Sequence, residues 1–379
     1  MVTLRGMTWG HRRAIDPLTG TMEAFRRKHP SIAIEWSARP LAGFEFQSVE
    51  DLSEEYDLIV LDHPFMGDAG AKKYLRDLSD LAGKEGDYIG PSLTTYRWGD
   101  AIYAVPIDAA CQVAAYRPDL MRAIDATLPR SWQDVLALGE HAERRGCRLA
   151  IGFAGVHSLM TAFTLMASLG HPWPNSPGGD ICDREALREA LGLMRSLTNF
   201  CPPEIFDWNS IALHEAMLAR DELVYCPAVY CYATYAEPDH REPLRFADLP
   251  GAAGCSPRGS TIGGTGLAVS AACRLPEIAF AYASYAAKAA TQLSFADHHG
   301  QPARIEAWSD PGIDGRFGDT FSATRATMEG SWIRPRYAGY LGFQNKAGNL
   351  VEQHLRGNLA EGHLLDALET TFAASGKGA

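Results

Sequence analysis

The sequence predicts an α/β protein of two domains. Its 379 residues are enough for two hydrophobic cores of ordinary size. Apolar strands alternate with amphipathic helices in the first 81 residues, which is typical of βαβ units and a parallel sheet. An extended apolar segment at residues 102–120 then breaks and resumes, with Asp108 at the break. Together these observations predict an α/β chain, and the broken segment at residues 102–120 is the candidate connection between its two domains.

The first half is expected to begin with a strand at residues 2–9 and a helix at residues 17–29, which Pro30 ends. A second strand follows at 31–36, and a buried strand, of the kind found in parallel sheets, at 56–61. Residues 70–81 predict the next helix.

Residues 102–120 allow two interpretations. Pro106 cannot donate to a sheet ladder and is expected to interrupt the strand, which resumes at Cys111–Tyr116. Asp108 is then either a solvated turn residue between two core strands, or a carboxylate in the crevice between two domains.

The same alternation continues after this segment. Ser131 is expected to cap a helix at residues 132–145. The remaining elements are strands at 149–153, 223–230 and 267–270, and helices at 159–169, 185–198, 207–219, 276–290, 342–355 and 363–372.

Composition and motifs exclude several functions. The net charge of −11 argues against nucleic acid as a partner, and no apolar run approaches the roughly 20 residues of a membrane span. The eight cysteines form no CxxC and no zinc spacing, and their apolar neighbours favour buried free thiols over disulfides. The sequence has no GxSxG elbow, so a Ser-His-Asp triad cannot be assigned. It also has no P-loop and no dinucleotide fingerprint. Neither a metal nor a cofactor is therefore expected.

Aromatic and polar residues gather at the predicted strand ends, where ligands of open α/β sheets bind. Aromatic rings stack on the C–H faces of sugars, and carboxylates accept hydroxyl hydrogen bonds. Gly263 and Gly264 leave room for a ligand to approach the main chain. The candidates at strand ends are Trp9, His11, Asp62, His63, Asp108, His157 and Tyr230.

Plainer roles remain open for these residues. Trp9 can be a packed core residue and Asp62 a helix cap, and tyrosines near residue 230 are more often packing than iron ligands. Cys111 beside Asp108 is the one candidate nucleophile, although its apolar neighbours favour a buried inert thiol.

Six segments are informative together because of their order and spacing. They are AFRRKHP (24–30), YDLIVL (56–61), YAVP (103–106), YRPDL (116–120), PRSWQDV (129–135) and GGTGLAVS (263–270). With them, nearly the whole chain resembles the family 1 extracellular solute-binding proteins, the group that includes maltose-binding protein. The resemblance implies a type II periplasmic-binding-protein-like fold with a central cleft.

The resemblance also implies discontinuous lobes: residues 1–109 with about 262–305, and 110–261 with about 306–379. Hinges are expected near 106–116, 250–262 and 300–320. Thr265 and, less directly, Tyr337 join the implied cleft residues. Thr265 stands where the family commonly has an aromatic residue, which removes one stacking platform.

The function implied is the solute-binding component of an ABC importer, without catalysis, which binds a small carbohydrate or polyol-like ligand by hinge closure. Its partners would be the permease subunits, and the protein is expected to be a periplasmic monomer. His11, His63 and His157 could also suit an acidic or phosphorylated ligand. The alternatives are a thiaminase-like enzyme using Cys111 and Asp108, or a cytoplasmic ligand sensor, since residues 2–9 look like a strand and not a leader.

Overall fold

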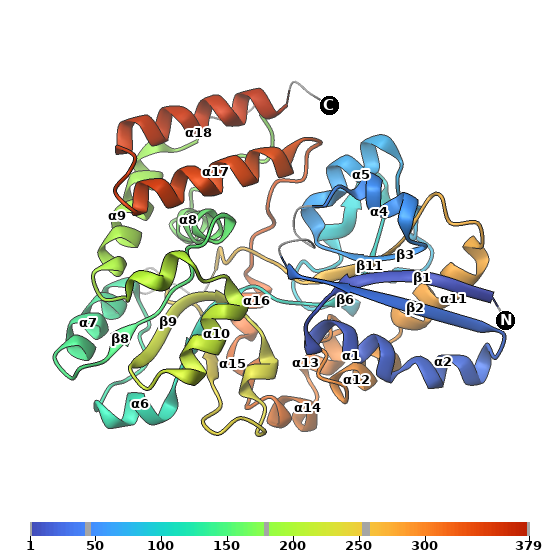
Figure 1. Cartoon of the computed structure of the whole chain (residues 1–379), viewed down its shortest axis with the longest axis horizontal. Coiled ribbons are helices and arrows are strands. Elements are labelled where there is room, and N and C mark those ends of the chain that lie inside the picture. The colour runs from blue at the N-terminus through green and yellow to red at the C-terminus, as the bar shows by residue number, and fades with distance from the viewer. Residues whose placement is uncertain (1, 42–46, 178–181, 252–257, 377–379) are drawn as a thin grey trace.

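Two mixed sheets organise the chain into two halves, as a computed structural model shows (Figure 1). The structure describes residues 2–41, 47–177, 182–251 and 258–376. The first sheet has the order β2-β1-β3-β11-β6 and the second the order β10-β7-β9-β8. A further pair, β4-β5, forms a small hairpin.

The strands of the first sheet are β1 (Val2–Trp9), β2 (Ile32–Arg39), β3 (Leu58–Leu61), β6 (Val105–Asp108) and β11 (Thr265–Val269). β1 runs parallel to β2 and β3, but β11 is antiparallel to both β3 and β6. The parallel sheet expected for the first 81 residues is confirmed for β1, β2 and β3, and β11 adds an antiparallel strand to it. Because β11 reverses, its first residue lies at the same edge as the last residues of β3 and β6.

Pro106 does not interrupt its strand, contrary to the sequence prediction. It lies inside β6 and pairs with Gly266 of β11. β6 is the edge strand of its sheet, so the missing N–H of Pro106 costs no ladder hydrogen bond on the outer side.

Helices cover both faces of the first sheet, with α1 and α2 on one side and α4 and α5 on the other (Figure 1). The helices of this half are α1 (Arg12–Gly20), α2 (Met22–Lys28), α4 (Val49–Glu55), α5 (Met66–Lys72), α11 (Pro276–Ala286) and α12 (Ala289–Ala296). Its short elements are η1 (His63–Phe65), η2 (Glu85–Asp87), η3 (Thr94–Tyr96), β4 (Arg97–Trp98) and β5 (Ala101–Ile102).

The second sheet contains β7 (Gln112–Tyr116), β8 (Arg148–Leu149), β9 (Leu223–Tyr230) and β10 (Arg245–Ala247). Its helices are α6 (Pro118–Ala123), α7 (Trp132–Glu143), α8 (Val156–Ser168), α9 (Arg184–Thr198), α10 (Ser210–Ala219), α15 (Thr320–Ala323), α16 (Arg325–Glu329), α17 (Tyr340–Leu355) and α18 (Glu361–Ser375), with η4 (Pro203–Phe206) and η5 (Ala233–Ala236). α13 (Ile305–Trp308) and α14 (Pro311–Arg316) lead from the first half to the second (Figure 1).

Several predicted helix and strand bounds were wrong. The helix expected at 17–29 starts at Arg12 and breaks at Thr21, and the helix expected at 70–81 ends at Lys72. The strand expected at 149–153 is only two residues long, and the helix expected at 276–290 is divided into α11 and α12. The capping box at Ser131 is confirmed.

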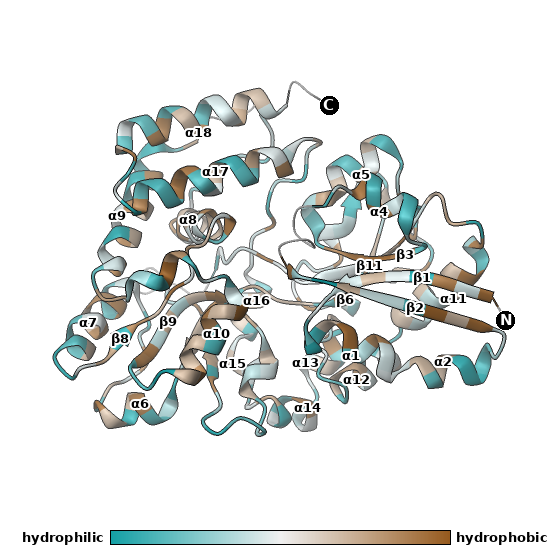
Figure 2. Ribbon diagram, viewed as in Figure 1, coloured by the Kyte–Doolittle hydropathy of each residue, from teal (hydrophilic) through white to brown (hydrophobic). Residues whose placement is uncertain are grey.

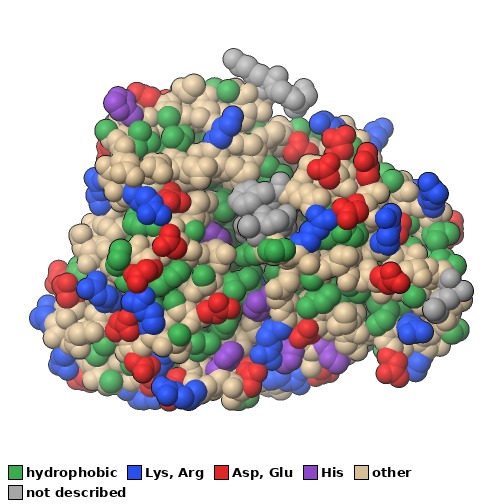
Figure 3. Space-filling model, viewed as in Figure 1, with side chains coloured by type: hydrophobic (Ala, Val, Ile, Leu, Met, Phe, Trp, Pro, Cys, Tyr) green, Lys and Arg blue, Asp and Glu red, His purple; other side chains and the backbone are tan. Residues whose placement is uncertain are grey.

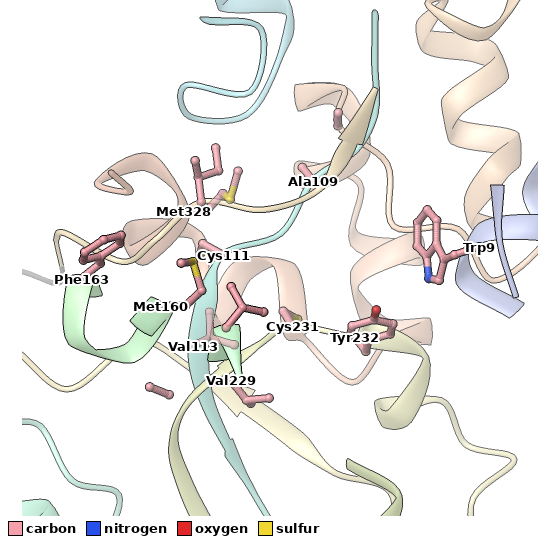
Figure 4. Close-up of a cluster of buried hydrophobic side chains, with 14 of the residues drawn as sticks. Trp9, Ala109, Cys111, Val113, Met160, Phe163, Val229, Cys231, Tyr232 and Met328 are labelled. Carbon is pink, nitrogen blue, oxygen red and sulfur yellow. The ribbon is translucent and has the colours of Figure 1, made fainter. Parts of the chain in front are cut away.

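Buried apolar side chains run continuously through both halves. Strands such as β3 and β9 are mostly brown in Figure 2, whereas teal marks outer turns of α2 and α18. Figure 4 shows Cys111, Val113, Met160 and Val229 packed where the chain enters the second sheet. The seven cysteines in the described ranges are free thiols, and Cys255 lies outside those ranges. Within the same ranges, no helix is long and apolar enough to cross a membrane.

The crossing between the halves is made by three adjacent segments. Gly263 donates its N–H to Ala110 O (2.7 Å), and Ala109 donates to Gln301 O (3.0 Å). The strands of each sheet fall within the segments expected for each lobe. The exact lobe limits and the hinges stay a prediction, and residues 252–257 of the expected 250–262 hinge lie outside the described ranges.

Leu267 in the centre of β11 should be a major source of stability, because β11 lies between β3 and β6 and the Leu267 side chain is fully buried. Leu267→Ala is expected to lower the free energy of unfolding by about 2–5 kcal/mol. Leu128→Ala, at a side chain that is 39% exposed, should change it by less than about 0.5 kcal/mol. Urea denaturation followed by circular dichroism measures both. Equal effects of the two substitutions would contradict the described core.

Candidate functional site

One pocket lies at the carboxyl edge of the first sheet, between the two halves. Its wall comprises Trp9, Arg13, Leu41, Asp62, Pro64, Phe65, Asp108, Ala110, Val156, His157, Met160, Ser210, Tyr230, Tyr232, Gly263, Gly264, Thr265, Arg334, Leu341 and Gln344. These residues come from β1, α1, η1, β6, α8, α10, β9, β11, α17 and the connecting loops, and so from both halves. The pocket holds about 90 Å³ of cavity.

The sheet topology explains why the polar residues of the first half meet here. Asp62 follows β3 and Asp108 ends β6, and these two strands run in the same direction on either side of β11. Thr265, the first residue of β11, is the register partner of Asp108. Trp9 ends the parallel strand β1, so one sheet edge carries all four side chains.

Asp108 forms a buried, bidentate ion pair with Arg13. Arg13 Nε lies 2.7 Å from Asp108 Oδ1, and Arg13 Nη2 lies 2.7 Å from Oδ2. Arg13 Nη1 also donates to the carbonyl of Cys231 (2.5 Å), and its guanidinium lies 4.5 Å from the ring centre of Tyr232. Burial raises the pKa of Asp108, and the Arg13 guanidinium opposes that rise. The pair ties α1 to the end of β6 and to the second half.

Asp62 forms a second ion pair with Arg334, and this one spans the two halves. Arg334 Nη2 lies 2.5 Å from Asp62 Oδ2, and Arg334 Nη1 donates to Gln344 Oε1 (3.1 Å). Burial alone would raise the pKa of Asp62, but Arg334 and His63 outweigh it and hold that pKa well below its usual range. Both acids are therefore paired with an arginine.

The glycines before β11 are required by the backbone. Gly264 has φ +87°, and a Cβ there would lie 2.5 Å from the carbonyl oxygen of Asp108. A Cβ on Gly263 would lie 2.9 Å from the ring of Tyr230. Close packing at the crossing thus accounts for both glycines, in addition to any approach by a ligand.

Eight of the eleven predicted site residues line the pocket: Trp9, Asp62, Asp108, His157, Tyr230, Gly263, Gly264 and Thr265. Trp9 belongs to the core as well as the pocket wall, and Figure 4 shows it near Tyr232. Their role as ligand contacts stays a prediction.

The other three predicted residues point elsewhere. His11 caps α1, where its Nδ1 accepts from Arg13 N–H (3.1 Å), and its ring packs edge-on to Tyr232. His63 is fully buried in η1, 2.9 Å from Asp62. Tyr337 bonds Ser375 through its hydroxyl (2.6 Å). These three side chains are therefore not part of this pocket wall, and their role as ligand contacts stays a prediction.

Sequence reasoning missed the two arginines. Arg13 lies between the strand expected at 2–9 and the helix expected at 17–29, whereas α1 begins one residue before Arg13. Arg334 lies in the aromatic and basic segment 331–340, and that unusual composition was the available signal. Tyr232, Ser210 and Gln344 of the wall were missed as well.

Cys111 is unsuited to act as a nucleophile. It is buried and absent from the pocket wall, and burial strongly raises the pKa of its thiol. A thiolate is therefore disfavoured, and the thiaminase-like alternative gains no support. In the described residues, no group of three or more His, Cys, Asp and Glu is placed to hold a metal ion.

His157 in the pocket wall is held neutral. Burial and the Arg334 charge lower its pKa to about 4, and burial likewise lowers the pKa of His214 to about 3. In the unfolded chain each takes up a proton below about pH 6.5, whereas the folded chain does so only near the lowered pKa.

The free energy of unfolding should therefore fall as pH decreases from about 6.5 to 4, by up to about 1.4 kcal/mol per pH unit for each such histidine. His157→Gln removes one of these groups, so its stability should fall less steeply with decreasing pH. Urea denaturation at pH 7, 6 and 5 measures the two slopes. Identical slopes would show that His157 is not held neutral by the fold.

The fold matches solved solute-binding proteins along its whole length. A maltose-bound MalE3 of T. maritima superimposes with a TM-score of 0.82 at 17% identity, covering 98% of this chain and 99% of that one. A solute-binding protein of Thermotoga lettingae bound to α-D-tagatose gives 0.83 at 14% identity, covering 99% and 100%. One of Agrobacterium radiobacter bound to ribitol gives 0.78 at 17% identity, covering 98% of each chain.

These likenesses, at such low identity, show the fold to be that of type II periplasmic binding proteins. No curated protein matches the chain by sequence. The family model described as bacterial extracellular solute-binding protein matches residues 47–304, about two thirds of the chain. The chain therefore belongs to the bacterial extracellular solute-binding proteins.

Proposed function

We propose that this protein is the solute-binding component of an ABC importer and binds a small carbohydrate or polyol between two lobes that close by hinge motion. It would work outside the cytoplasmic membrane, in the periplasm, as a monomer that presents its closed form to the permease subunits. The lobes would be residues 1–109 with about 262–305, and 110–261 with about 306–379.

The pocket wall is the observation that carries this proposal. Aromatic side chains of both halves, Trp9, Phe65, Tyr230 and Tyr232, lie in one wall with charged and hydroxyl-bearing side chains. Sugars need this combination, because their C–H faces pack on rings and their hydroxyls need placed donors and acceptors. The solved proteins of like fold include ones bound to maltose, tagatose and ribitol, which agrees with this chemistry.

Contacts between the halves support closure as the working motion. Residues 334–339, here called the clasp, lead from the second half into α17 and lie on the first half. Arg336 Nη1 donates to the carbonyls of Thr94 (2.5 Å), Thr95 (2.7 Å) and Arg97 (2.9 Å). Gly339 N–H donates to Asp68 Oδ1 (3.0 Å).

A second set of contacts lies where α1 meets the chain around η5. Arg12 pairs with Glu237 (3.2 Å) and Asp239 (2.9 Å), and His299 Nδ1 lies 2.8 Å from Glu237. On the face shown in Figure 3, histidine, acidic and basic side chains gather along the lower part of the boundary between the halves. Arg12, Asp239 and His299 are partly exposed, although Glu237 is buried. Polar contacts with exposed partners can be broken and remade at modest cost, as a domain closure requires.

A ligand screen tests the proposed function. Sugars and polyols should raise the melting temperature of the purified protein. A ligand that binds only the folded state increases the free energy of unfolding by about 2.7 kcal/mol when its concentration is 100 times its Kd. Amino acids and short peptides form the control set. No shift with any carbohydrate, together with a shift from the control set, would contradict the proposal.

Replacing Arg336 of the clasp should weaken closure to the same extent for every ligand. Arg336 lies outside the pocket wall, and its guanidinium donates hydrogen bonds to three carbonyls of the first half. Arg336→Met should therefore reduce the affinity for all ligands by one common factor, roughly 10-fold or more. Calorimetry with two ligands from the screen measures that factor.

Small-angle scattering of the ligand-free variant should show a larger radius of gyration, because the open form is favoured. Lys346→Met, on the exposed side of α17, is the matched control and should alter neither quantity. A loss of affinity confined to one ligand would show that Arg336 acts on the ligand and not on closure.

A further inference from the structure

The charged side chains of the pocket wall cancel one another. Two arginines and two aspartates line the pocket, and they are joined as Arg13–Asp108 and Arg334–Asp62. The side chains of Arg13, Asp108 and Arg334 are almost completely buried and that of Asp62 is 23% exposed, so water screens these charges poorly. The pocket wall therefore has no unbalanced charge for an ionic ligand to neutralise.

The histidine in the wall adds no positive charge at neutral pH, since burial and Arg334 lower the pKa of His157 to about 4. His157 Nε2 and Thr265 Oγ1 are buried and have no hydrogen-bond partner among the described residues. Arg334 Nε has none either. Two of these three groups are neutral, and a ligand hydroxyl, which donates and accepts, can satisfy each of them.

An anionic ligand would disturb this balance. Its carboxylate or phosphate would have to share the Arg334 guanidinium with Asp62, which would leave two negative charges beside one buried positive charge. Two negative charges close together in a buried site are costly. Either the ligand anion or the Asp62 carboxylate would have to become protonated or give up its contact with Arg334. A cationic ligand would meet two arginines in the same way.

The cavity also limits the size of the ligand. One water molecule needs roughly 10–15 Å³ of such space, so about 90 Å³ holds on the order of six to nine waters. That space suits one sugar ring or a short open-chain polyol. The second ring of a disaccharide would need the Arg334–Asp62 contact across the halves to stay open.

We propose that the ligand is an uncharged molecule the size of a single sugar ring, and that Asp62 determines this selectivity by occupying Arg334. This rests on the proposed function and narrows it. Sugar acids, sugar phosphates and oligosaccharides are excluded, which decides against the acidic or phosphorylated ligand that the histidines had suggested.

Calorimetry on the wild-type protein with matched ligands tests the inference. The set comprises neutral hexoses and hexitols, each with its own aldonic acid and 6-phosphate, and disaccharides that contain it. One neutral member is expected to bind at least 10-fold more tightly than its charged or larger derivatives. Tightest binding of an acid, a phosphate or a disaccharide would overturn the inference and leave the proposed function standing. If none of these carbohydrates binds, and an amino acid or peptide from the control set of the ligand screen does bind, the proposed function itself is contradicted.

A variant that removes the negative charge of Asp62 provides a second test. Asp62→Asn leaves Arg334 without its carboxylate, so the affinity for the aldonic acid relative to the neutral ligand should rise at least 10-fold. Asp68→Asn is the matched control, because Asp68 also joins the halves, through Gly339 N–H, but lies outside the pocket wall. It should lower both affinities by the same factor. An unchanged ratio in folded Asp62→Asn protein would overturn the role of Asp62.

Discussion

The buried pair of Arg13 and Asp108 constrains the arrangement of both halves. A guanidinium and a carboxylate that have lost their water must keep each other as partners, since removing one leaves an uncompensated buried charge at a cost of about 3–5 kcal/mol. Arg13 is in the first turn of α1, and Asp108 is the last residue of β6, so the pair fixes where the chain leaves the first sheet. Its third contact, to the carbonyl of Cys231, brings the chain after β9 to the same point.

The crossing segments are packed around that point. Gly264 adopts a positive φ directly against the carbonyl of Asp108, and Gly263 is bonded to Ala110. Gln301 donates its side-chain amide to Ala109 O (2.7 Å) and accepts from Ala233 N–H (2.9 Å). In the proposed hinge motion these few residues absorb the rotation, while the Arg13–Asp108 contact stays within the first half. The part of the pocket wall that belongs to the first half then stays rigid, and the part that belongs to the second half moves.

Strand ends were predictable from the sequence, because apolar runs and their polar successors are local patterns. That is why Asp62, Asp108 and Tyr230 were correctly placed at the pocket wall. The direction of a side chain at a strand end is set by the following turn, which the pattern does not encode: η1 turns His63 into the core. Arg334 reaches Asp62 across 272 positions of sequence, and no local pattern predicts a contact of that range.

The Arg334–Asp62 pair links selectivity to closure, since one residue of the pair belongs to the clasp and the other to the first sheet. The pair forms when the halves are together, so it favours the closed form whether or not a ligand is bound. A ligand can shift the population only by binding the closed form better than the open one. A neutral ligand leaves the pair intact and adds its own contacts to it. An anion that competes for Arg334 gives up the stabilisation that the pair supplies to closure, so its net gain on closing is smaller. The same contact therefore selects the ligand and sets how strongly that ligand closes the protein.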